Sequence, residues 1–173
     1  RKQAIAVSAK RDIARRAAAL IPEGAAIFLD VGTTIEAAAA ALNGHERLQV
    51  FTTSLLAALH FDHHRHDVQV IGGRLAGQDG SLVGEAVIHQ LTRLRLDFAL
   101  IGCSGIEPAG RVMDFDLAKI AVKRAAMDGA AEAVLLATSE KFGRSARAEI
   151  AGLSDFSHVV TEADTSCAGA TAR

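Results

Sequence analysis

The sequence contains few of the residues that disulfide-rich and nucleic-acid-binding proteins depend on. Its 173 residues include two Cys, two Pro, seven Phe and no Trp or Tyr. Cys103 and Cys167 lie far apart in the sequence, so we expect neither a structural disulfide nor a cysteine metal site. Without Trp and Tyr, few aromatic rings are left on which single-stranded nucleic acid could stack.

Charge and hydropathy argue against two further classes of protein. The formal net charge is −1, and the one dense group of basic residues is the short stretch 11–16. The electrostatic pattern of a nucleic-acid-binding domain is therefore missing. No apolar run approaches the roughly 20 residues of a membrane span, and no signal-peptide pattern opens the chain. We expect a cytoplasmic protein that binds neither membranes nor, by itself, DNA.

The order of hydrophobic segments is typical of an α/β domain, and the chain is long enough for one domain with its own core. Segments with helical and strand periodicity alternate. The segments 98–101 and 134–136 are apolar throughout, as expected when both faces of a parallel sheet are covered. The predicted helices are 2–21, 35–42, 54–61, 85–93, 116–130 and a short one at 146–151, and the predicted strands are 25–29, 48–51, 68–71, 98–101, 133–136 and 158–160. This order predicts a three-layer, open, mostly parallel sheet with helices on both faces.

Small and hydroxyl-bearing residues follow the predicted strands, at the edge where open parallel sheets bind ligands. The first strand ends in the segment 30–34 (Asp-Val-Gly-Thr-Thr), which then opens a helix. Such a turn offers a phosphate two hydroxyls and the first N–H groups of the helix, but an ordinary turn with Thr34 as helix N-cap explains it equally well. Turns favour small residues in general. Lys141, after the strand 133–136, supplies the positive charge that a phosphate site needs.

Six short motifs occur in an order that resembles a known family. They are 18–24 (AALIPEG), 27–34 (IFLDVGTT), 72–73 (GG), 81–84 (SLVG), 104–106 (SGI) and 139–143 (SEKFG). Together they resemble the effector-sensing, C-terminal domain of DeoR-family bacterial transcriptional regulators, over roughly residues 10–164. The resemblance implies a fold related to ribose-5-phosphate isomerase and glucosamine-6-phosphate deaminase, a phosphorylated sugar as effector, and a homo-oligomer. It also implies an N-terminal winged helix-turn-helix, which we expect to be absent from this chain.

Three positions depart from the residues that this family usually carries. Thr53 and Thr138 stand where Asn and Asp are usual, and Glu107 stands where Asp is common. These departures concern the identity of the sugar more than the phosphate, because the elements expected to bind the phosphate, 32–34 and Lys141, are intact.

We therefore expect residues 1–164 to form a sugar-phosphate sensor domain, followed by a disordered tail at 165–173. The effector would control DNA binding by the missing N-terminal domain, and we expect no cofactor and no metal. The expected ligand-binding residues are Asp30, Gly32, Thr33, Thr34, Thr53, Ser54, Gly73, Ser104, Gly105, Asp114 and Lys141.

The alternative function is a sugar-phosphate isomerase or deaminase of the same fold. Such an enzyme needs a carboxylate that moves a proton between adjacent sugar carbons, and Glu85, Glu107, Asp114 and Asp116 are candidates. The Asp-Gly-x-Asp and Lys-Gly-Gly-Gly segments of the related isomerases are absent, which favours the regulatory interpretation. Asp114 and Asp116 could equally bind sugar hydroxyls or cap the helix that begins near 116.

Other polar residues have plain structural explanations. His60 and His64 have the i,i+4 spacing of a helical metal pair, but His is also favoured at the end of a helix, which is the interpretation we prefer. Cys103 could be a nucleophile at a strand end, although a small residue that fills a tight loop is the better explanation. We expect Lys119 and Lys123 to form screened, solvent-exposed pairs with an acidic residue of the same helix.

Overall fold

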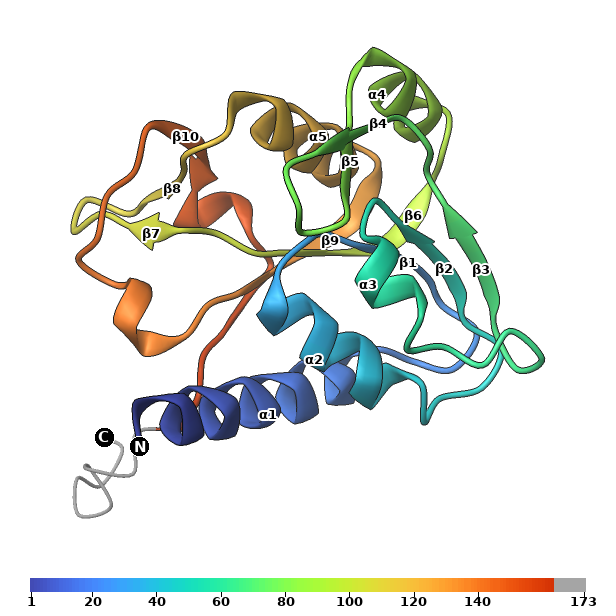
Figure 1. The fold of residues 1–173 in the computed structure, drawn as a ribbon, viewed down its shortest axis with the longest axis horizontal. Helices are drawn as coiled ribbons and strands as arrows, with labels where there is room; N and C mark the ends of the chain where they lie inside the picture. The colour runs from blue at the N-terminus through green and yellow to red at the C-terminus, as the bar shows by residue number, and fades with distance from the viewer. Residues whose placement is uncertain (164–173) are drawn as a thin grey trace.

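The computed structural model describes residues 1–163, so the predicted tail at 165–173 lies outside the described residues. Its centre is a six-stranded sheet in which every neighbouring pair is parallel (Figure 1). The strands, in spatial order, are β11 (His158–Val160), β9 (Ala130–Leu136), β6 (Leu96–Ile101), β1 (Ala26–Leu29), β2 (Gln49–Thr52) and β3 (Asp67–Val70). The predicted open parallel sheet is confirmed.

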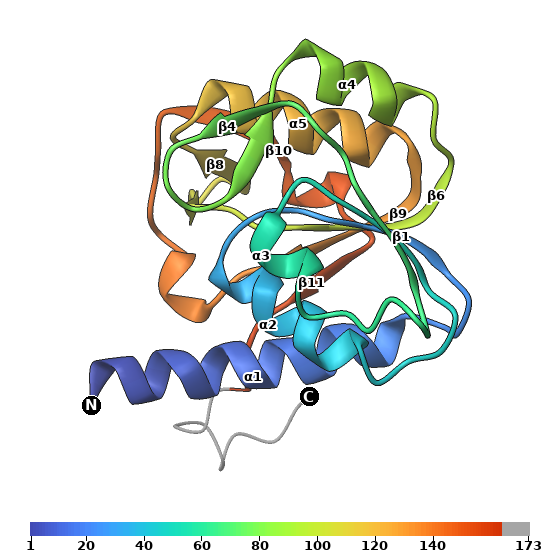
Figure 2. The same cartoon turned by 45° about the vertical axis from the view of Figure 1, so that its right-hand side comes forward.

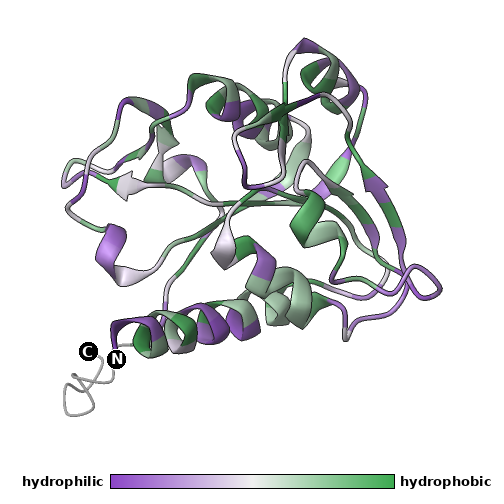
Figure 3. Ribbon diagram, in the orientation of Figure 1, coloured by the Kyte–Doolittle hydropathy of each residue, from purple (hydrophilic) through white to green (hydrophobic). Residues whose placement is uncertain are grey.

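Helices cover both faces of this sheet. The helices α1 (Lys2–Leu20), α2 (Thr33–Leu42) and α3 (Leu55–Ala58) lie on one face, and α4 (Glu85–Thr92) and α5 (Leu117–Asp128) lie on the other (Figures 1 and 2). In β1, Ile27 and Leu29 join the core under α1 and α2, whereas Phe28 joins the core under α4 and α5. Figure 3 shows this apolar character along the central strands. Among residues 1–163, no helix has both the length and the apolar character needed to cross a membrane.

Two small antiparallel sheets accompany the main one. A hairpin pairs β4 (Arg74–Ala76) with β5 (Ser81–Val83), and a second sheet joins β7 (Gly105–Ile106), β8 (Arg111–Asp114) and β10 (Ala148–Gly152). The helix predicted at 146–151 was wrong, since β10 occupies that segment. Its Ala-rich sequence favours a helix locally, but pairing with β8 and the burial of Ile150 outweigh this preference. The short segments η1 (Ser139–Lys141) and η2 (Leu153–Asp155) are 3₁₀ helices.

The order of the strands creates a crevice beside β1. From β1 the chain builds β2 and β3 on one side, and later returns to place β6 on the other side of β1. The connections that leave the carboxyl ends of β1 and β6 therefore diverge. Ligands of open α/β sheets bind at such a switch point, so the topology directs attention to the residues that follow β1 and β6.

Gly73 lies where the chain packs closely against β5 and α4, whereas the adjacent Gly72 does not. A Cβ at Gly73 would lie 2.5 Å from Val87 Cγ2 and 2.6 Å from Val83 O, whereas a Cβ at Gly72 would meet no heavy atom of residues 1–163 within 4 Å. We expect Gly73→Ala to lower the free energy of unfolding by about 1–3 kcal/mol, and Gly72→Ala to change it by less than about 0.5 kcal/mol. Urea denaturation measures both values, and equal effects would contradict this packing role of Gly73.

Candidate functional site

A cavity of about 260 Å³ opens at the switch point. Its wall is built from three segments that follow central strands: 31–35 after β1, 102–104 after β6, and 136–138 with 140–141 at the end of β9. Other elements contribute five further side chains, which are Lys10, Asp79, Asp114, Lys119 and Lys123. Segments far apart in the sequence thus meet around one small hollow.

The N-terminus of α2 forms one side of the cavity. Gly32 is the N-cap residue, with φ 113° and ψ 162°. Residues that carry a Cβ rarely adopt this conformation, whereas glycine adopts it readily. Thr34 is therefore a residue of the helix and not its cap, so that alternative was wrong. No side chain of residues 1–163 caps α2, and the first N–H groups of a helix have no acceptor within it. They give this side of the cavity a positive partial charge that suits an anion.

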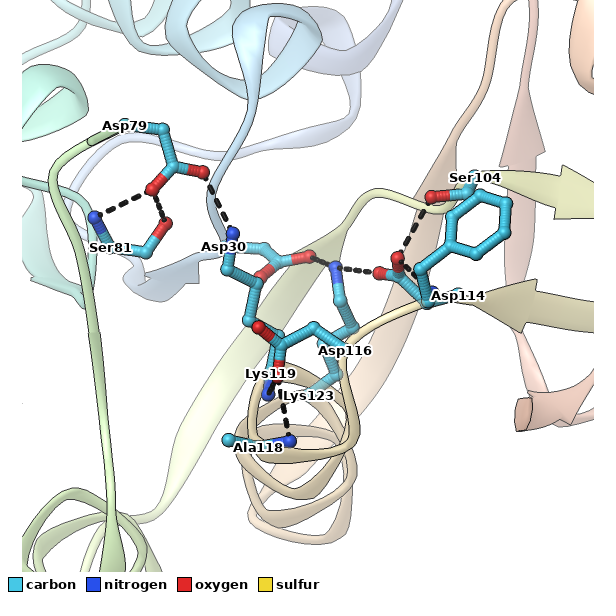
Figure 4. A network of polar contacts seen from close by, with 10 residues as sticks. Asp30, Asp79, Ser81, Ser104, Asp114, Asp116, Ala118, Lys119 and Lys123 are labelled. Atoms are coloured by element: carbon cyan, nitrogen blue, oxygen red, sulfur yellow. Dashed lines mark hydrogen bonds and ion pairs between the residues drawn. The ribbon is translucent and has the colours of Figure 1, made fainter. Parts of the chain in front are cut away.

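Lys123 of α5 carries a buried charge to the base of the cavity. Its side chain is 3% exposed; its Nζ donates to the Asp30 carboxylate and, at 3.0 Å, to Gly102 O, and lies 3.3 Å from Asp114 Oδ2 (Figure 4). Burial alone would lower the pKa of Lys123, but the facing carboxylates outweigh burial and raise the pKa above its usual value. The ammonium therefore stays charged. Our expectation of a solvent-exposed pair was wrong for Lys123.

The two carboxylates of this network have further partners. Asp30 Oδ2 also accepts from Gly102 N at 2.9 Å. Asp114 Oδ1 accepts from Ser104 Oγ and from the backbone N of residue 115, both at 2.8 Å (Figure 4). Asp116, by contrast, caps α5 and accepts from the N–H groups of residues 118 and 119. The sequence left open whether these two aspartates bind sugar hydroxyls or cap the helix. Asp116 caps α5, whereas Asp114 lines the cavity.

A second ion pair ties the β4–β5 hairpin to α5. Lys119 Nζ donates to Asp79 Oδ2 at 2.8 Å, and Asp79, in the turn of the hairpin, also accepts from Ser81 Oγ at 2.7 Å (Figure 4). Partial burial would raise the pKa of Asp79, but the hydrogen bonds from Lys119 and Ser81 lower it overall. Lys119 thus forms an ion pair at the surface, with a partner on another element.

Two lysines of the cavity wall are not neutralised in this way. Lys10 and Lys141 are half-buried, and neither forms an ion pair with another residue among 1–163. Beside them, Thr138 is 5% exposed, and its Oγ1 is buried with no hydrogen-bond partner in the described part of the chain. Two cations, an unsatisfied hydroxyl and a helix N-terminus therefore line the same cavity, and this combination favours an anionic ligand.

The structure brings most of the predicted ligand residues together. Asp30 lies just beneath the cavity wall, where it pairs with Lys123. Six of the eleven residues line the cavity: Gly32, Thr33, Thr34, Ser104, Asp114 and Lys141.

The other four predicted residues do not line the cavity. Ser54 is the N-cap of α3, and its Oγ accepts from Ala57 N at 3.0 Å. A Cβ at Gly105 would lie 2.5 Å from Arg144 O, so Gly105, like Gly73, is explained by close packing. Thr53 is buried, and its Oγ1 has no partner among residues 1–163.

Four lysine and aspartate residues of the cavity are absent from the sequence-based prediction: Lys10, Asp79, Lys119 and Lys123. For Lys123 a signal existed. It lies three residues after Ile120 and three before Ala126, both of which are buried, so the helical period places it on the core side of α5. Asp79 depends on the β4–β5 hairpin, and Lys10 depends on how α1 docks. Neither feature is visible in the hydrophobic pattern.

Cys103 lines the cavity but is not poised as a nucleophile. Burial raises the pKa of its thiol to about 11, in spite of the nearby lysines, which act in the opposite direction. Because the thiolate is the reactive form, a thiol with this pKa stays protonated and inert at neutral pH.

The histidine-rich segment 60–66 lies outside this cavity. The helix α3 ends at Ala58, so His60 and His64 do not form a pair on one helix. His66 is buried, and its Nδ1 accepts from Leu48 N at 3.2 Å. Asp62, His63 and His64 bring their ligand atoms within 4.8 Å of one another, but all three are exposed, and we assign no metal to them.

Comparison with known proteins confirms the resemblance seen in the motifs. Residues 5–163 match the family model described as "DeoR C terminal sensor domain". The glycerol-3-phosphate regulon repressor of Haemophilus influenzae is 40% identical over 153 residues, which are 88% of this chain and 60% of that protein. The repressor of the same name from Escherichia coli is 35% identical over 164 residues, which are 94% of this chain and 65% of that protein.

Among solved structures, ribose 5-phosphate isomerase A from Methanocaldococcus jannaschii superposes with a TM-score of 0.55 at 16% identity, covering 77% of this chain and 53% of that one. This likeness shows the fold alone. The chain spans three fifths to two thirds of the length of the two repressors. Because the matched domain is a sensor and these relatives are repressors, the prediction of a regulatory domain and not an enzyme is confirmed.

The two lysines of α5 are expected to differ sharply in their effect on stability. Lys123→Met leaves Asp30 buried without its counterion, so the free energy of unfolding should fall by about 3–5 kcal/mol. Lys119→Met removes a surface pair and should cost less than about 1 kcal/mol. Urea denaturation of both variants tests the difference. The double variant Asp30→Asn/Lys123→Met should recover part of the loss, and a Lys123→Met protein as stable as the parent would contradict the buried network.

Proposed function

Since the chain belongs to the DeoR family of transcriptional regulators, as its C-terminal sensor domain, we propose that the cavity binds a small phosphorylated polyol or sugar. Binding of this effector, in the cytoplasm, controls DNA binding by another part of the full-length regulator. The observation that carries the proposal is the pair of lysines, Lys10 and Lys141, that face a helix N-terminus without a carboxylate partner among the described residues.

The cavity has two chemically distinct sides. We place the phosphate at the N-terminus of α2, between the hydroxyls of Thr33 and Thr34 and the ammonium of Lys141, where charge-assisted hydrogen bonds can form. The hydroxyls of the effector are placed towards Ser104 and the Asp114 carboxylate, which accepts hydrogen bonds. A ligand with an anionic end and a hydroxyl-bearing end matches this polarity.

The size of the cavity supports a small effector. Pockets for drug-sized ligands typically measure about 300–1,000 Å³, and this cavity, at about 260 Å³, falls below that range. The two repressors compared above are named for the glycerol-3-phosphate regulon. Glycerol 3-phosphate is therefore the first compound to test, followed by pentose and hexose phosphates.

A thermal unfolding panel tests the class of effector. Each phosphate, beginning with glycerol 3-phosphate, is paired with its unphosphorylated parent, here glycerol. At about 100 times Kd a true effector adds about 2.7 kcal/mol, which raises Tm by roughly 5–10 °C for a domain of this size. The proposal predicts a shift with one phosphate and none with its parent. Equal shifts with the parent compounds, or no shift with any phosphate, would contradict the proposed phosphate site.

Lys141 is expected to contribute to the affinity without contributing to the fold. Lys141→Ala should weaken binding of the phosphorylated effector about thirtyfold, the equivalent of about 2 kcal/mol, while the far-UV circular dichroism stays unchanged. The matched control is Lys2→Ala, since Lys2 is exposed and does not line the cavity. Isothermal titration calorimetry measures both affinities. An unchanged affinity in Lys141→Ala would show that the phosphate binds elsewhere.

A further inference from the structure

The N-terminal half of α1 is held less firmly than its C-terminal half. None of the residues 2–12 is buried, and Ile5 and Val7 are exposed. The buried residues of the helix begin at Ile13 and pack into the core that α2 shares. In Figures 1 and 2 the N-terminal end of α1 extends along the side of the molecule on which η1 lies. Within residues 1–163, this half of the helix therefore has few contacts with the rest of the domain.

One side chain of this half reaches the cavity. Lys10 lines the cavity together with Lys141 and the first residues of α2, and it forms no ion pair with another residue among 1–163. Close to Lys10, Asp12 Oδ2 accepts a hydrogen bond from Ala163 N at 2.8 Å. Lys10 is thus the direct link between the N-terminal half of α1 and the proposed effector site.

The charges around the cavity make this link dependent on the ligand. Lys10 and Lys141 carry the same charge, so without an anion between them they repel each other. A phosphate placed between them replaces this repulsion with two attractive, charge-assisted contacts. An anionic ligand therefore stabilises the docked position of α1, and removal of the ligand loosens it.

We propose that Lys10 binds the phosphate of the effector, and that this contact fixes the N-terminal half of α1 against the sensor domain. This inference rests on the proposed function. It makes α1 the element through which the effector acts on the segment that precedes it in a full-length regulator. The signal is a change in the order of a helix, since a ligand shifts a conformational equilibrium only through a contact that differs between the two states.

The test uses Lys10→Gln, which removes the charge and keeps a polar side chain of similar length. Lys2→Gln is the matched control, because Lys2 is exposed on the same helix and does not line the cavity. Calorimetry gives the affinity of this chain for glycerol 3-phosphate, with inorganic phosphate as a second probe. Hydrogen exchange followed by mass spectrometry gives the protection of the amides of residues 5–12, with each variant compared at equal occupancy of the ligand.

We expect Lys10→Gln to bind glycerol 3-phosphate about tenfold more weakly than the parent. Ligand should slow amide exchange at 5–12 in the parent and in Lys2→Gln, and leave it unchanged in Lys10→Gln. If the parent binds the ligand but Lys10→Gln binds equally well, or its α1 gains the same protection, this inference is overturned and the proposed function stands. If the parent binds neither probe, both the proposed function and this inference are contradicted.

Discussion

The buried ammonium of Lys123 is the interaction on which the candidate site depends. It joins α5 to residues that follow β1 and β6 and to the end of β8, through Asp30, Gly102 and Asp114. Removing such charges from water costs several kcal/mol per ion, and only mutual pairing and hydrogen bonding offset this cost. The partners are therefore held in one arrangement, and the floor of the cavity is in place before any ligand arrives.

This arrangement separates charges that maintain the structure from charges that remain available. Lys123 and Lys119 are paired with carboxylates that belong to the protein, whereas Lys10 and Lys141 line the cavity and have no such partner among residues 1–163. An anion that enters the cavity can therefore pair with both ammonium groups without first breaking an ion pair between them and a carboxylate of the described residues. Asp114, held by Lys123 and Ser104, presents an acceptor on the other side. An ion-paired base and the two ammonium groups of Lys10 and Lys141 together define the polarity of the site.

Much of the fold could be predicted from the sequence, because it follows from local patterns. Continuously apolar strands indicate a covered parallel sheet, and a Gly-Thr-Thr turn after the first strand indicates the edge at which the cavity lies. The same small residues, however, also cap helices and permit close packing, which is what Ser54 and Gly105 do. A pattern of Gly, Ser and Thr cannot separate these roles. Lys123, Asp79 and Lys10 reach the cavity through tertiary contacts, and β10 adopts its form because β8 lies beside it.

Cys103 adds a consequence for the chemical conditions under which such a sensor works. Peroxides and related oxidants attack thiolates, and a thiolate in the wall of the cavity would be converted to a bulkier, more polar group. Since burial keeps this sulfur protonated, the wall resists oxidation at neutral pH. At this position the shape of the proposed effector cavity is therefore protected from oxidants that would modify an exposed thiolate.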